Sequence, residues 1–384
     1  MIGLIYLDNA ATSWPKPRAV VEEMARFMET IGGNPGRGGH SLTLAASRLV
    51  YRARERVARL IGASDPMRIV FTANATEALN LAIKGFLRVG DHVVTTSMEH
   101  NSVIRPLLAL EARNVTFDAV TASAEGSLSI NELEAAVGPR TRLLAISHAS
   151  NVTGAMAPLN EISALCRRRG IKLLVDAAQT AGVLPLDVEA LPVDLLAFAG
   201  HKGLLGPPGT GGLYVGSGIA LDPLIHGGTG SASDEELQPG FLPDRYESGT
   251  LNTVGLAGLA AGVEFVLREG IESIREKEDA LARRIRQGLR EVRGVIVHGP
   301  QETDRAVAVI SFSVGDRDPG DVAFALDRAF GIAVRAGLHC APRAHRTIGT
   351  FPGGTVRVSP GYFNEEREVE AFLKATSEIA SEGT

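Results

Sequence analysis

Short apolar runs that alternate with helical patterns dominate the first two thirds of the chain. Six runs have the length of a strand, and each precedes a turn and then apolar residues at helical spacing. They span residues 68–72, 92–96, 115–117, 142–147, 172–176 and 195–198. Strands that are apolar on both faces and separated by helices are typical of a parallel sheet with helices on both sides. The sequence therefore predicts a doubly wound α/β fold.

The pattern changes after about residue 250. It predicts a long amphipathic helix over 271–292, helices at 321–330 and from 365, and strands at 294–298, 306–312, 331–335 and 355–359. These elements predict a second, smaller α+β unit. We expect a large domain over residues 15–253 and a small domain over residues 254–384, to which the N-terminal segment 1–14 also belongs.

Composition argues against several classes of protein. The formal charge of −5 gives no electrostatic reason to bind nucleic acid or an anionic membrane. The longest apolar stretch, residues 254–267, is interrupted by Glu264 and is too short to span a bilayer. The first residues lack the basic region and the apolar length of a signal peptide. Two cysteines, Cys166 and Cys340, cannot form a disulfide framework, so we expect a cytoplasmic protein.

Ligands of a parallel sheet bind beyond the carboxyl ends of its strands, so the residues that follow each strand are the first candidates. Ala75 and Thr76 open a helix and could offer N–H groups and a hydroxyl to a phosphate, although Thr76 could equally be a simple N-cap. His100 and Asn151 follow two further strands. Either could bind a ligand, or His100 could be a structural histidine and Asn151 could only hold a turn.

Two strand ends carry charges that are costly to bury. Asp176 ends an apolar run, so its carboxylate needs a cationic partner or its pKa rises. A protonated ring nitrogen would be such a partner, and capping of the next helix is the alternative. Lys202 follows a buried strand within glycine-rich backbone, and a desolvated lysine is what a Schiff base with an aldehyde cofactor requires. Together these loops match how a protein holds pyridoxal phosphate.

Over nearly its whole length the chain resembles a fold-type I pyridoxal-phosphate enzyme of aminotransferase class V, in the cysteine desulfurase group. The resemblance rests on seven motifs: Tyr6-Leu-Asp-Asn-Ala-Ala-Thr12, Ala75-Thr-Glu-Ala78, Met98-Glu-His100, Asp176-Ala-Ala-Gln179, His201-Lys202, Glu247-Ser-Gly-Thr250 and Pro360-Gly-Tyr-Phe-Asn364. It implies pyridoxal phosphate as the cofactor and a large domain whose mixed, mostly parallel sheet lies between helices.

The resemblance also implies a role for each matched residue. The cofactor would be bound by residues at consecutive strand ends. Ala75 and Thr76 would bind the phosphate, His100 would stack on the ring and act in catalysis, and Asn151 would lie near the ring oxygen. Asp176 would lie at the ring nitrogen with Gln179 beside it, and Lys202, preceded by His201, would be covalently attached. Thr250 would reach the phosphate of a partner subunit, which implies a homodimer. Ala199 stands where relatives usually have a serine that binds the phosphate, so other donors must compensate.

The small domain would carry the sulfur chemistry. The stretch from Arg335 to Cys340 resembles the one with the desulfurase nucleophile, and Arg357 matches the arginine that pairs with the substrate carboxylate, with Arg335 also at the substrate. We expect Cys340 among positive groups that favour its thiolate: Arg335, His339, Arg343, His345 and Arg346. From its surroundings alone, Cys340 could equally be a buried structural residue. With the neighbouring histidines it lacks the spacing of a zinc site, so no metal is expected.

The resemblance therefore implies a desulfurase that converts L-cysteine to L-alanine and leaves a persulfide on Cys340. Relatives with such a short cysteine loop commonly pass the sulfur to an acceptor protein, and Leu338 stands where they often have a second histidine. A selenocysteine lyase, another class V C–S lyase or aminotransferase, and a non-catalytic phosphate-binding scaffold are the alternatives. Cys166 shares an apolar helix face with Ile162 and Leu165, so we expect it in the core.

Overall fold

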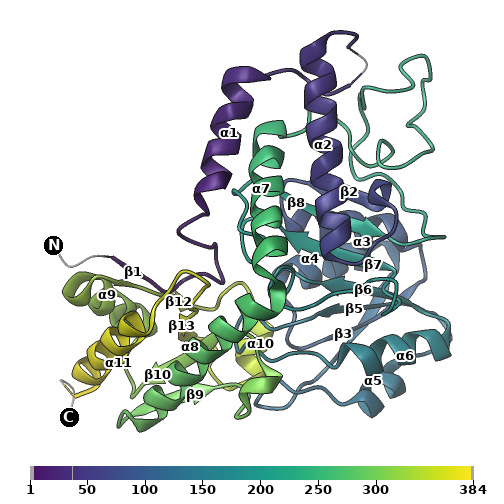
Figure 1. Ribbon diagram of the computed structural model, residues 1–384. Helices are drawn as coiled ribbons and strands as arrows, with labels where there is room; N and C mark the ends of the chain where they lie inside the picture. The colour runs from purple at the N-terminus through teal and green to yellow at the C-terminus, as the bar shows by residue number, and fades with distance from the viewer. Residues whose placement is uncertain (1–3, 37, 382–384) are drawn as a thin grey trace.

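One large sheet organises the molecule, as the alternating pattern predicts (Figure 1). A computed structural model describes residues 4–36 and 38–381. The sheet has seven strands in the order β2-β8-β7-β6-β5-β3-β4. In chain order they are β2 Ile69–Thr72, β3 His92–Thr96, β4 Thr116–Val120, β5 Thr141–Ser147, β6 Lys172–Asp176, β7 Leu195–Ala199 and β8 Gly211–Val215.

Strand β8 makes the sheet mixed. It runs antiparallel to both β7 and β2, whereas all other neighbours are parallel. The six strands expected from the sequence are confirmed, but β8 was not expected because its glycines are typical of a loop. At Gly212 a Cβ atom would collide with the Phe198 ring and with the Val70 carbonyl oxygen, 2.7 Å away, so the close approach of β8 to its neighbours requires glycine.

Helices cover both faces of this sheet, and strand residues alternate between two apolar clusters. In β6, Leu173 and Val175 pack into one cluster and Leu174 into the other. Helices α2 (Ser41–Leu60), α6 (Leu159–Arg169) and α7 (Thr253–Glu269) contribute to the first cluster, and α3 (Ala75–Phe86) and α4 (Asn101–Leu110) to the second. Cys166 of α6 is 3% exposed, which confirms its place in the core.

A smaller, antiparallel sheet has the strand order β12-β13-β10-β9, and a separate parallel pair joins β1 to β11. The strands are β1 Ile5–Tyr6, β9 Val295–His298, β10 Ile310–Val314, β11 Ile332–Ala333, β12 Arg335–Gly337 and β13 Thr355–Val358. The other helices are α1 Arg18–Thr30, α5 Ile130–Ala136, α8 Ile271–Glu291, α9 Pro319–Phe330, α10 Pro342–Thr347 and α11 Glu366–Ser381, with short 3₁₀ turns at Pro66–Arg68, Glu111–Arg113 and Thr303–Arg305.

A buried arginine explains why the strand expected at 306–312 begins only at Ile310. Arg286, 2% exposed, donates from Nη2 to the carbonyl oxygens of Val307 and Val309 at 3.1 and 3.0 Å. These carbonyls therefore satisfy a buried guanidinium instead of a neighbouring strand. The strand expected at 331–335 is likewise two short strands, β11 and β12, which belong to different sheets.

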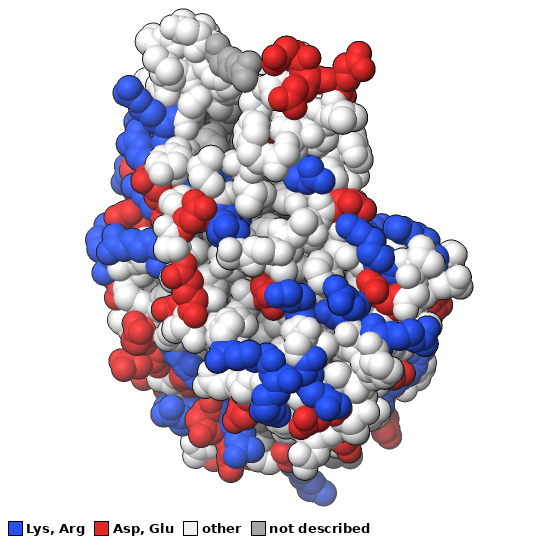
Figure 2. Space-filling view, turned by 90° about the vertical axis from the view of Figure 1, so that its right-hand side faces the viewer, with Lys and Arg blue, Asp and Glu red and all other residues white. Residues whose placement is uncertain are grey.

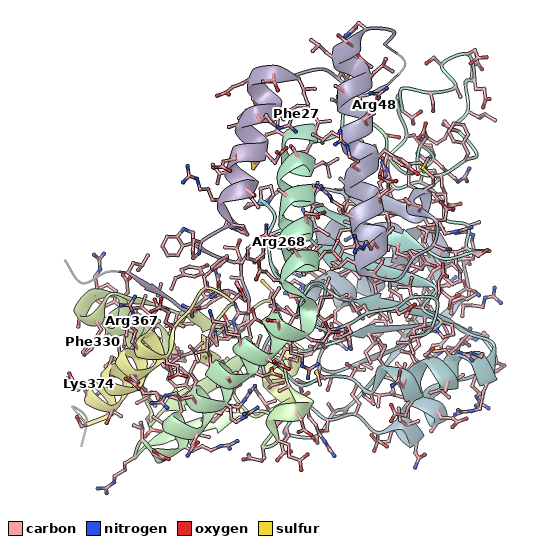
Figure 3. All side chains as sticks on the ribbon, in the orientation of Figure 1. Phe27, Arg48, Arg268, Phe330, Arg367 and Lys374 are labelled. Carbon is pink, nitrogen blue, oxygen red and sulfur yellow. The ribbon has the colours of Figure 1, made fainter. Side chains whose placement is uncertain are left out.

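The expected domain boundary lies where α7 begins. This helix packs against α1 and α2, and Phe27 projects from α1 toward α7 and is 3% exposed (Figure 3). The division into domains 15–253 and 254–384 stays a prediction, and residues 1–3, 37 and 382–384 lie outside the described part of the chain. No helix among the described residues is both long and apolar enough to cross a membrane. Acidic and basic side chains are mixed over much of the surface in Figure 2.

One buried ion pair fastens the segment that carries Thr250 to the large sheet. The two terminal nitrogens of the Arg54 guanidinium on α2, Nη1 and Nη2, donate to the two carboxylate oxygens of Glu247, and each side chain is 5% exposed. The backbone N–H of Phe71 in β2 also donates to Glu247, and the guanidinium lies 4.6 Å from the centre of the Phe71 ring. Burial raises the pKa of Glu247, and Arg54 opposes that shift. The carboxylate therefore depends on Arg54.

We expect Arg54→Met to lower the free energy of unfolding by about 3 kcal/mol or more, because it leaves Glu247 as an unpaired buried charge. Arg18→Met is the matched control, since Arg18 and its partner Glu22 are 91% and 58% exposed and such pairs contribute less than about 1 kcal/mol. Urea unfolding of both variants measures the difference. Equal losses in the two variants would contradict the assignment.

Candidate active site

The carboxyl ends of the parallel strands and the starts of α3 and α4 enclose a cavity of about 230 Å³. Most of the residues that the sequence selected line it: Ala75, Thr76, His100, Asn151, Asp176, Gln179, His201 and Lys202. Ala199, the departure from the family pattern, lies there too. The structure therefore brings together residues from loops that are far apart in the chain, as the strand-end rule predicts.

Two opposite charges face each other in this cavity. Burial lowers the pKa of Lys202 to about 8, and attraction to the Asp176 carboxylate opposes that shift. Burial raises the pKa of Asp176, although the Ala178 N–H donates to its Oδ1 at 2.9 Å. Asp176 thus has both a cation nearby, Lys202, and a raised pKa. A lysine with a lowered pKa supplies more of the neutral amine that can attack a carbonyl carbon.

A second buried carboxyl, Glu99, lies close enough to Asp176 to interact with it electrostatically. Its oxygens accept from the Thr96 hydroxyl at 2.6 Å and from the Ser147 N–H and hydroxyl at 2.8 and 2.7 Å. Burial raises the pKa of Glu99 to about 7, and repulsion from Asp176 adds to that rise. Glu99 is 1% exposed and is not among the residues that line the cavity, and its hydrogen bonds join the ends of β3 and β5.

His100 caps the start of α4. Its Nδ1 accepts from the Ser102 N–H at 3.0 Å, which leaves the ring proton on Nε2. Burial, with a smaller contribution from Lys202, lowers the pKa of His100 to about 4, so the ring is uncharged at neutral pH. The Ser102 hydroxyl lies 2.7 Å from that of Thr76. A flat neutral ring and two hydroxyls therefore share one wall of the cavity.

The start of α3 also lines the cavity. Asn74 caps this helix by accepting from the Glu77 N–H at 2.9 Å. The first N–H groups of a helix, here those of Ala75 and Thr76, have no acceptor within the helix and suit an anion. The N-cap role that the sequence offered for Thr76 therefore belongs to Asn74. Thr76 itself is free to turn its hydroxyl toward Ser102.

The N-terminal segment holds the lysine loop in place. The Ser13 hydroxyl donates to the carbonyl oxygen of Lys202 at 3.0 Å, and the Lys16 amine donates to that of His201 at 2.8 Å. Thr12 and Ser13 also donate to the His201 carbonyl. Burial lowers the pKa of Lys16 to about 8. These bonds fix the backbone of His201 and Lys202.

Two arginines of the small sheet share one carboxylate. Arg357 on β13, 2% exposed, donates to Asp8 Oδ1 at 3.0 Å and to the Asn151 carbonyl oxygen at 3.0 Å. Arg335 on β12 donates to the other oxygen of Asp8, with its Nη2 at 2.9 Å. The Nε of Arg357 is buried without a partner among the described residues. Arg357 thus keeps one unsatisfied donor beside Asn151, which lines the cavity.

Cys340 lies in a turn whose backbone is bonded to the cavity wall. Its carbonyl oxygen accepts from the Asn101 N–H at 2.8 Å, and the carbonyl of His339 accepts from the Asn151 side chain at 2.6 Å. His339 and Cys340 have φ of +49° and +57°, a conformation that residues with a Cβ rarely adopt. The thiol residue is exposed, so the alternative of a buried structural cysteine is wrong.

The two histidines near Cys340 are not the positive groups that the sequence predicted. His339 Nδ1 lies 3.3 Å from His345 Nε2, and His345 Nδ1 lies 2.7 Å from the Thr350 hydroxyl. Burial lowers the pKa of His339 to about 2 and that of His345 to about 4, so both rings are neutral at physiological pH. Only the arginines supply positive charge here.

Thr250 lies outside this cavity. It lines a separate hollow of about 690 Å³, together with Arg54, Glu247 and the loop residues 228–231. Its predicted contact with the phosphate of a partner subunit stays a prediction. Gln179, by contrast, lies in the cavity and donates to the Ala10 carbonyl oxygen at 3.1 Å.

Comparison with known proteins identifies the family. The sequence model of the Aminotransferase class-V family matches residues 5–372. The chain belongs to this family. A probable cysteine desulfurase of Methanothermobacter thermautotrophicus is 38% identical over 99% of this class-V chain and 95% of that protein, and a cysteine desulfurase of Salmonella agona is 34% identical over 98% and 94%.

Solved structures of cysteine desulfurases share the fold of this class-V chain. The apo structure of the enzyme from Thermococcus onnurineus superposes with a TM-score of 0.93 at 35% identity, covering 98% of this chain and 95% of that one. A cysteine desulfurase of Escherichia coli, in an S-sulfonic acid form, gives a TM-score of 0.88 at 30% identity, covering 99% and 95%. The predicted fold class and family are therefore confirmed.

Three residues of the class-V site were not selected from the sequence. Asp8 and Glu99 both lie inside motifs that were recognised, but their partners are set by the tertiary fold. Ser102 opens α4 two residues after His100, and a hydroxyl at a helix start was a usable signal for an anion site. For Asp8, the signal was a carboxylate next to an apolar strand in a chain that also needs counter-ions for Arg335 and Arg357.

The raised pKa of Glu99 predicts a stability that depends on pH. The folded protein holds its proton up to about pH 7, whereas the unfolded chain releases it near 4.5, so stability falls as the pH rises between these values. The loss is on the order of 3 kcal/mol. Glu99→Gln keeps the shape and has no proton to lose. In cofactor-free protein we therefore expect Glu99→Gln to have a lower free energy of unfolding than the unchanged protein at pH 5. At pH 8 we expect this difference to shrink or to reverse.

Urea unfolding of the two proteins at both pH values measures this difference. Glu99→Gln and the unchanged protein share all other titrating groups, so the difference between them isolates Glu99. A difference that stays constant from pH 5 to pH 8 would show that the Glu99 carboxyl titrates normally.

Proposed function

We propose that this protein is a pyridoxal-phosphate-dependent cysteine desulfurase that converts L-cysteine to L-alanine. The observation that carries the proposal is the bonding of the Cys340 turn to the cavity wall. The backbone of the turn that carries this exposed thiol is bonded to Asn101, next to His100, and to Asn151, which lines the cavity together with Lys202. The relatives named as cysteine desulfurases support the same reaction.

The cavity suits pyridoxal phosphate in size and chemistry. The N–H groups that open α3 and the hydroxyls of Thr76 and Ser102 suit the phosphate, and Ser102 compensates for the hydroxyl that Ala199 lacks. The Nδ1 of His201 is buried there without a partner among the described residues, which leaves a polar atom for a ligand. His100 would stack on the ring, and Lys202 would bind the aldehyde carbon.

Bound pyridoxal phosphate supplies an electron-withdrawing ring that stabilises negative charge at the substrate Cα. Asp176 would keep a proton on the ring nitrogen, and that nitrogen would give its buried carboxylate a cationic partner in addition to Lys202. The Lys202 amine, once free, removes and returns protons near Cα, for which a pKa near 8 is well placed. The Lys16 and Ser13 bonds keep the lysine backbone in position during these transfers.

Arg357 would bind the substrate carboxylate. Its unsatisfied Nε and its Nη groups can make a two-point contact with a carboxylate, which also fixes the direction of the substrate side chain. Arg335, held by the same Asp8, adds positive charge to this end of the site. We expect this orientation to direct the substrate sulfur toward the turn that carries Cys340.

Cys340 then takes the sulfur. Its thiolate attacks the substrate sulfur and forms an S–S bond, while the bond between the substrate Cβ and sulfur breaks. The electron pair of that bond stays on Cβ, which takes up a proton, so the products are L-alanine and a Cys340 persulfide. We further propose a homodimer in which Thr250 reaches the partner's phosphate, an acceptor protein for the sulfur, and a reducing cytoplasmic location that keeps the exposed thiol free.

Attachment of the cofactor at Lys202 is testable directly. Borohydride reduction followed by peptide mass mapping should place the cofactor on Lys202 in the loaded protein. We expect Lys202→Arg to lose both this adduct and the visible absorbance of the bound cofactor. Lys16→Arg, which alters the neighbouring amine, should keep both. Reduction that labels another lysine in fully loaded protein would overturn the assignment.

Cys340→Ala should keep the cofactor absorbance but lower alanine formation from L-cysteine by about 100-fold or more, because the sulfur has no nucleophile to receive it. Cys166→Ala is the control: burial raises the pKa of Cys166 to about 12, so this thiol cannot substitute. Retained activity in Cys340→Ala would disprove the role of the thiol. Pyruvate and ammonia in place of alanine would indicate an eliminating C–S lyase.

A further inference from the structure

Exposed or half-buried arginines from two helices and a strand lie near the Cys340 turn. Arg105 has an exposed side chain and lies on α4, one turn beyond Asn101. The N–H of Asn101 donates to the Cys340 carbonyl oxygen. Arg343 and Arg346 lie on α10, which begins two residues after Cys340. Arg335 on β12 is close enough to interact electrostatically with Cys340, and half of its side chain is exposed. We call Arg105, Arg343, Arg346 and the neighbouring Phe351 the cationic rim.

Aromatic rings hold two of these guanidinium groups in place. The Arg346 guanidinium lies 4.2 Å from the centre of the Phe351 ring, and that ring is 42% exposed. The Arg343 guanidinium lies 5.3 Å from the centre of the Phe117 ring. Stacking through its face leaves the N–H edge of an arginine free, and it lowers the entropy lost when that edge binds a carboxylate.

The positive charge of the rim is not neutralised within the molecule. Arg105, Arg343 and Arg346 form no ion pair with any described carboxylate, unlike the exposed Arg284, which pairs with Glu370 at 2.6 Å. No aspartate or glutamate occurs from residue 335 to residue 364, although the chain as a whole has a charge of −5. The nearby histidines are neutral, as their lowered pKa values require. Three arginines thus remain available to an outside anion.

We propose that the cationic rim binds the acceptor of the Cys340 sulfur, and that this acceptor is a protein whose receiving thiol lies among aspartate and glutamate side chains. The proposal rests on the proposed function, because it requires a persulfide on Cys340. An exposed aromatic ring beside arginines is typical of protein–protein contact centres, which favours a protein over a free small thiol. Complementary charge would steer the acceptor thiol to the persulfide.

The transfer needs no further reactant. The acceptor thiolate attacks the outer sulfur of the persulfide and forms a new S–S bond with it. The bond between the outer sulfur and Cys340 Sγ breaks, and its electron pair returns to Sγ as a thiolate. Arginines near Cys340 stabilise this leaving thiolate as well as the incoming acceptor. No oxidant or reductant is consumed.

Model peptides can measure the charge preference of the rim. The holoenzyme is first loaded with L-cysteine, freed from excess substrate, and checked by mass for one extra sulfur on Cys340. It then reacts with a peptide that has four aspartates around a central cysteine, or with the matched peptide that has four lysines. At low salt we expect the acidic peptide to remove the sulfur at least about tenfold faster, and this ratio to fall as salt rises.

Charge reversal in the rim should abolish that preference. In Arg343→Glu with Arg346→Glu we expect the ratio of the two rates to fall by about tenfold or more, and comparing rates within one protein cancels any change in the reactivity of Cys340. Arg328→Glu is the matched control. Arg328 is exposed and lies 5.6 Å from the Phe324 ring on α9, which is well apart from α10 in Figure 1.

Three results would overturn the proposal, and they are distinguishable from one another. A loaded enzyme whose ratio is the same in the double variant and in the Arg328 control would exclude the rim as the acceptor site. A ratio in the unchanged protein that does not respond to salt would exclude electrostatic recognition, and this measurement needs no folded variant. Absence of the extra sulfur on Cys340 would instead remove the proposed function, and the acceptor site with it.

Discussion

A single carboxylate between two arginines holds the candidate site together. Asp8 accepts from Arg357 at 3.0 Å and from Arg335 at 2.9 Å, and a guanidinium as deeply buried as that of Arg357 requires such a partner. A few residues later the same segment donates to the backbone of Lys202 through Ser13. The segment therefore links the proposed cofactor lysine, in the turn after β7 of the large sheet, to the proposed carboxylate-binding arginine on β13 of the small sheet.

Burial shifts the pKa values of the cavity side chains before any ligand binds. It lowers the pKa of Lys202 to about 8 and that of His100 to about 4, and it raises the pKa of Asp176. The cavity thus contains a neutral ring, a lysine that readily loses its proton, and a carboxyl that gains stability when a cation arrives. Glu99, with its pKa raised to about 7, adds a second carboxyl that is neutral over part of the physiological range. A ligand that brings a protonated ring nitrogen relieves the cost of burying Asp176, so cofactor binding and the charge of the site are coupled.

Local pattern predicted much of this arrangement, because strand ends converge wherever a parallel sheet forms. It placed Lys202 and Asp176 in one cavity without knowledge of their contacts. What it missed depends on contacts between distant segments: the partners of Asp8, and the glycines of β8 that fit beneath Phe198. The charge of His345 was predicted wrongly for the same reason, since burial and not sequence distance to Cys340 decides its protonation.

The geometry of the Cys340 turn connects the two halves of the sulfur chemistry. Left-handed backbone at both His339 and Cys340 costs roughly 1–3 kcal/mol per residue, and the bonds from Asn151 and Asn101 to the carbonyls of this turn offset that cost. With its backbone anchored on both sides, the thiol can move only by rotation about its own side chain. If Cys340 carries the persulfide, as proposed, its sulfur therefore stays close to the turn. The proposed acceptor would then have to come to Cys340, and the surface that surrounds the turn would decide which acceptors can approach.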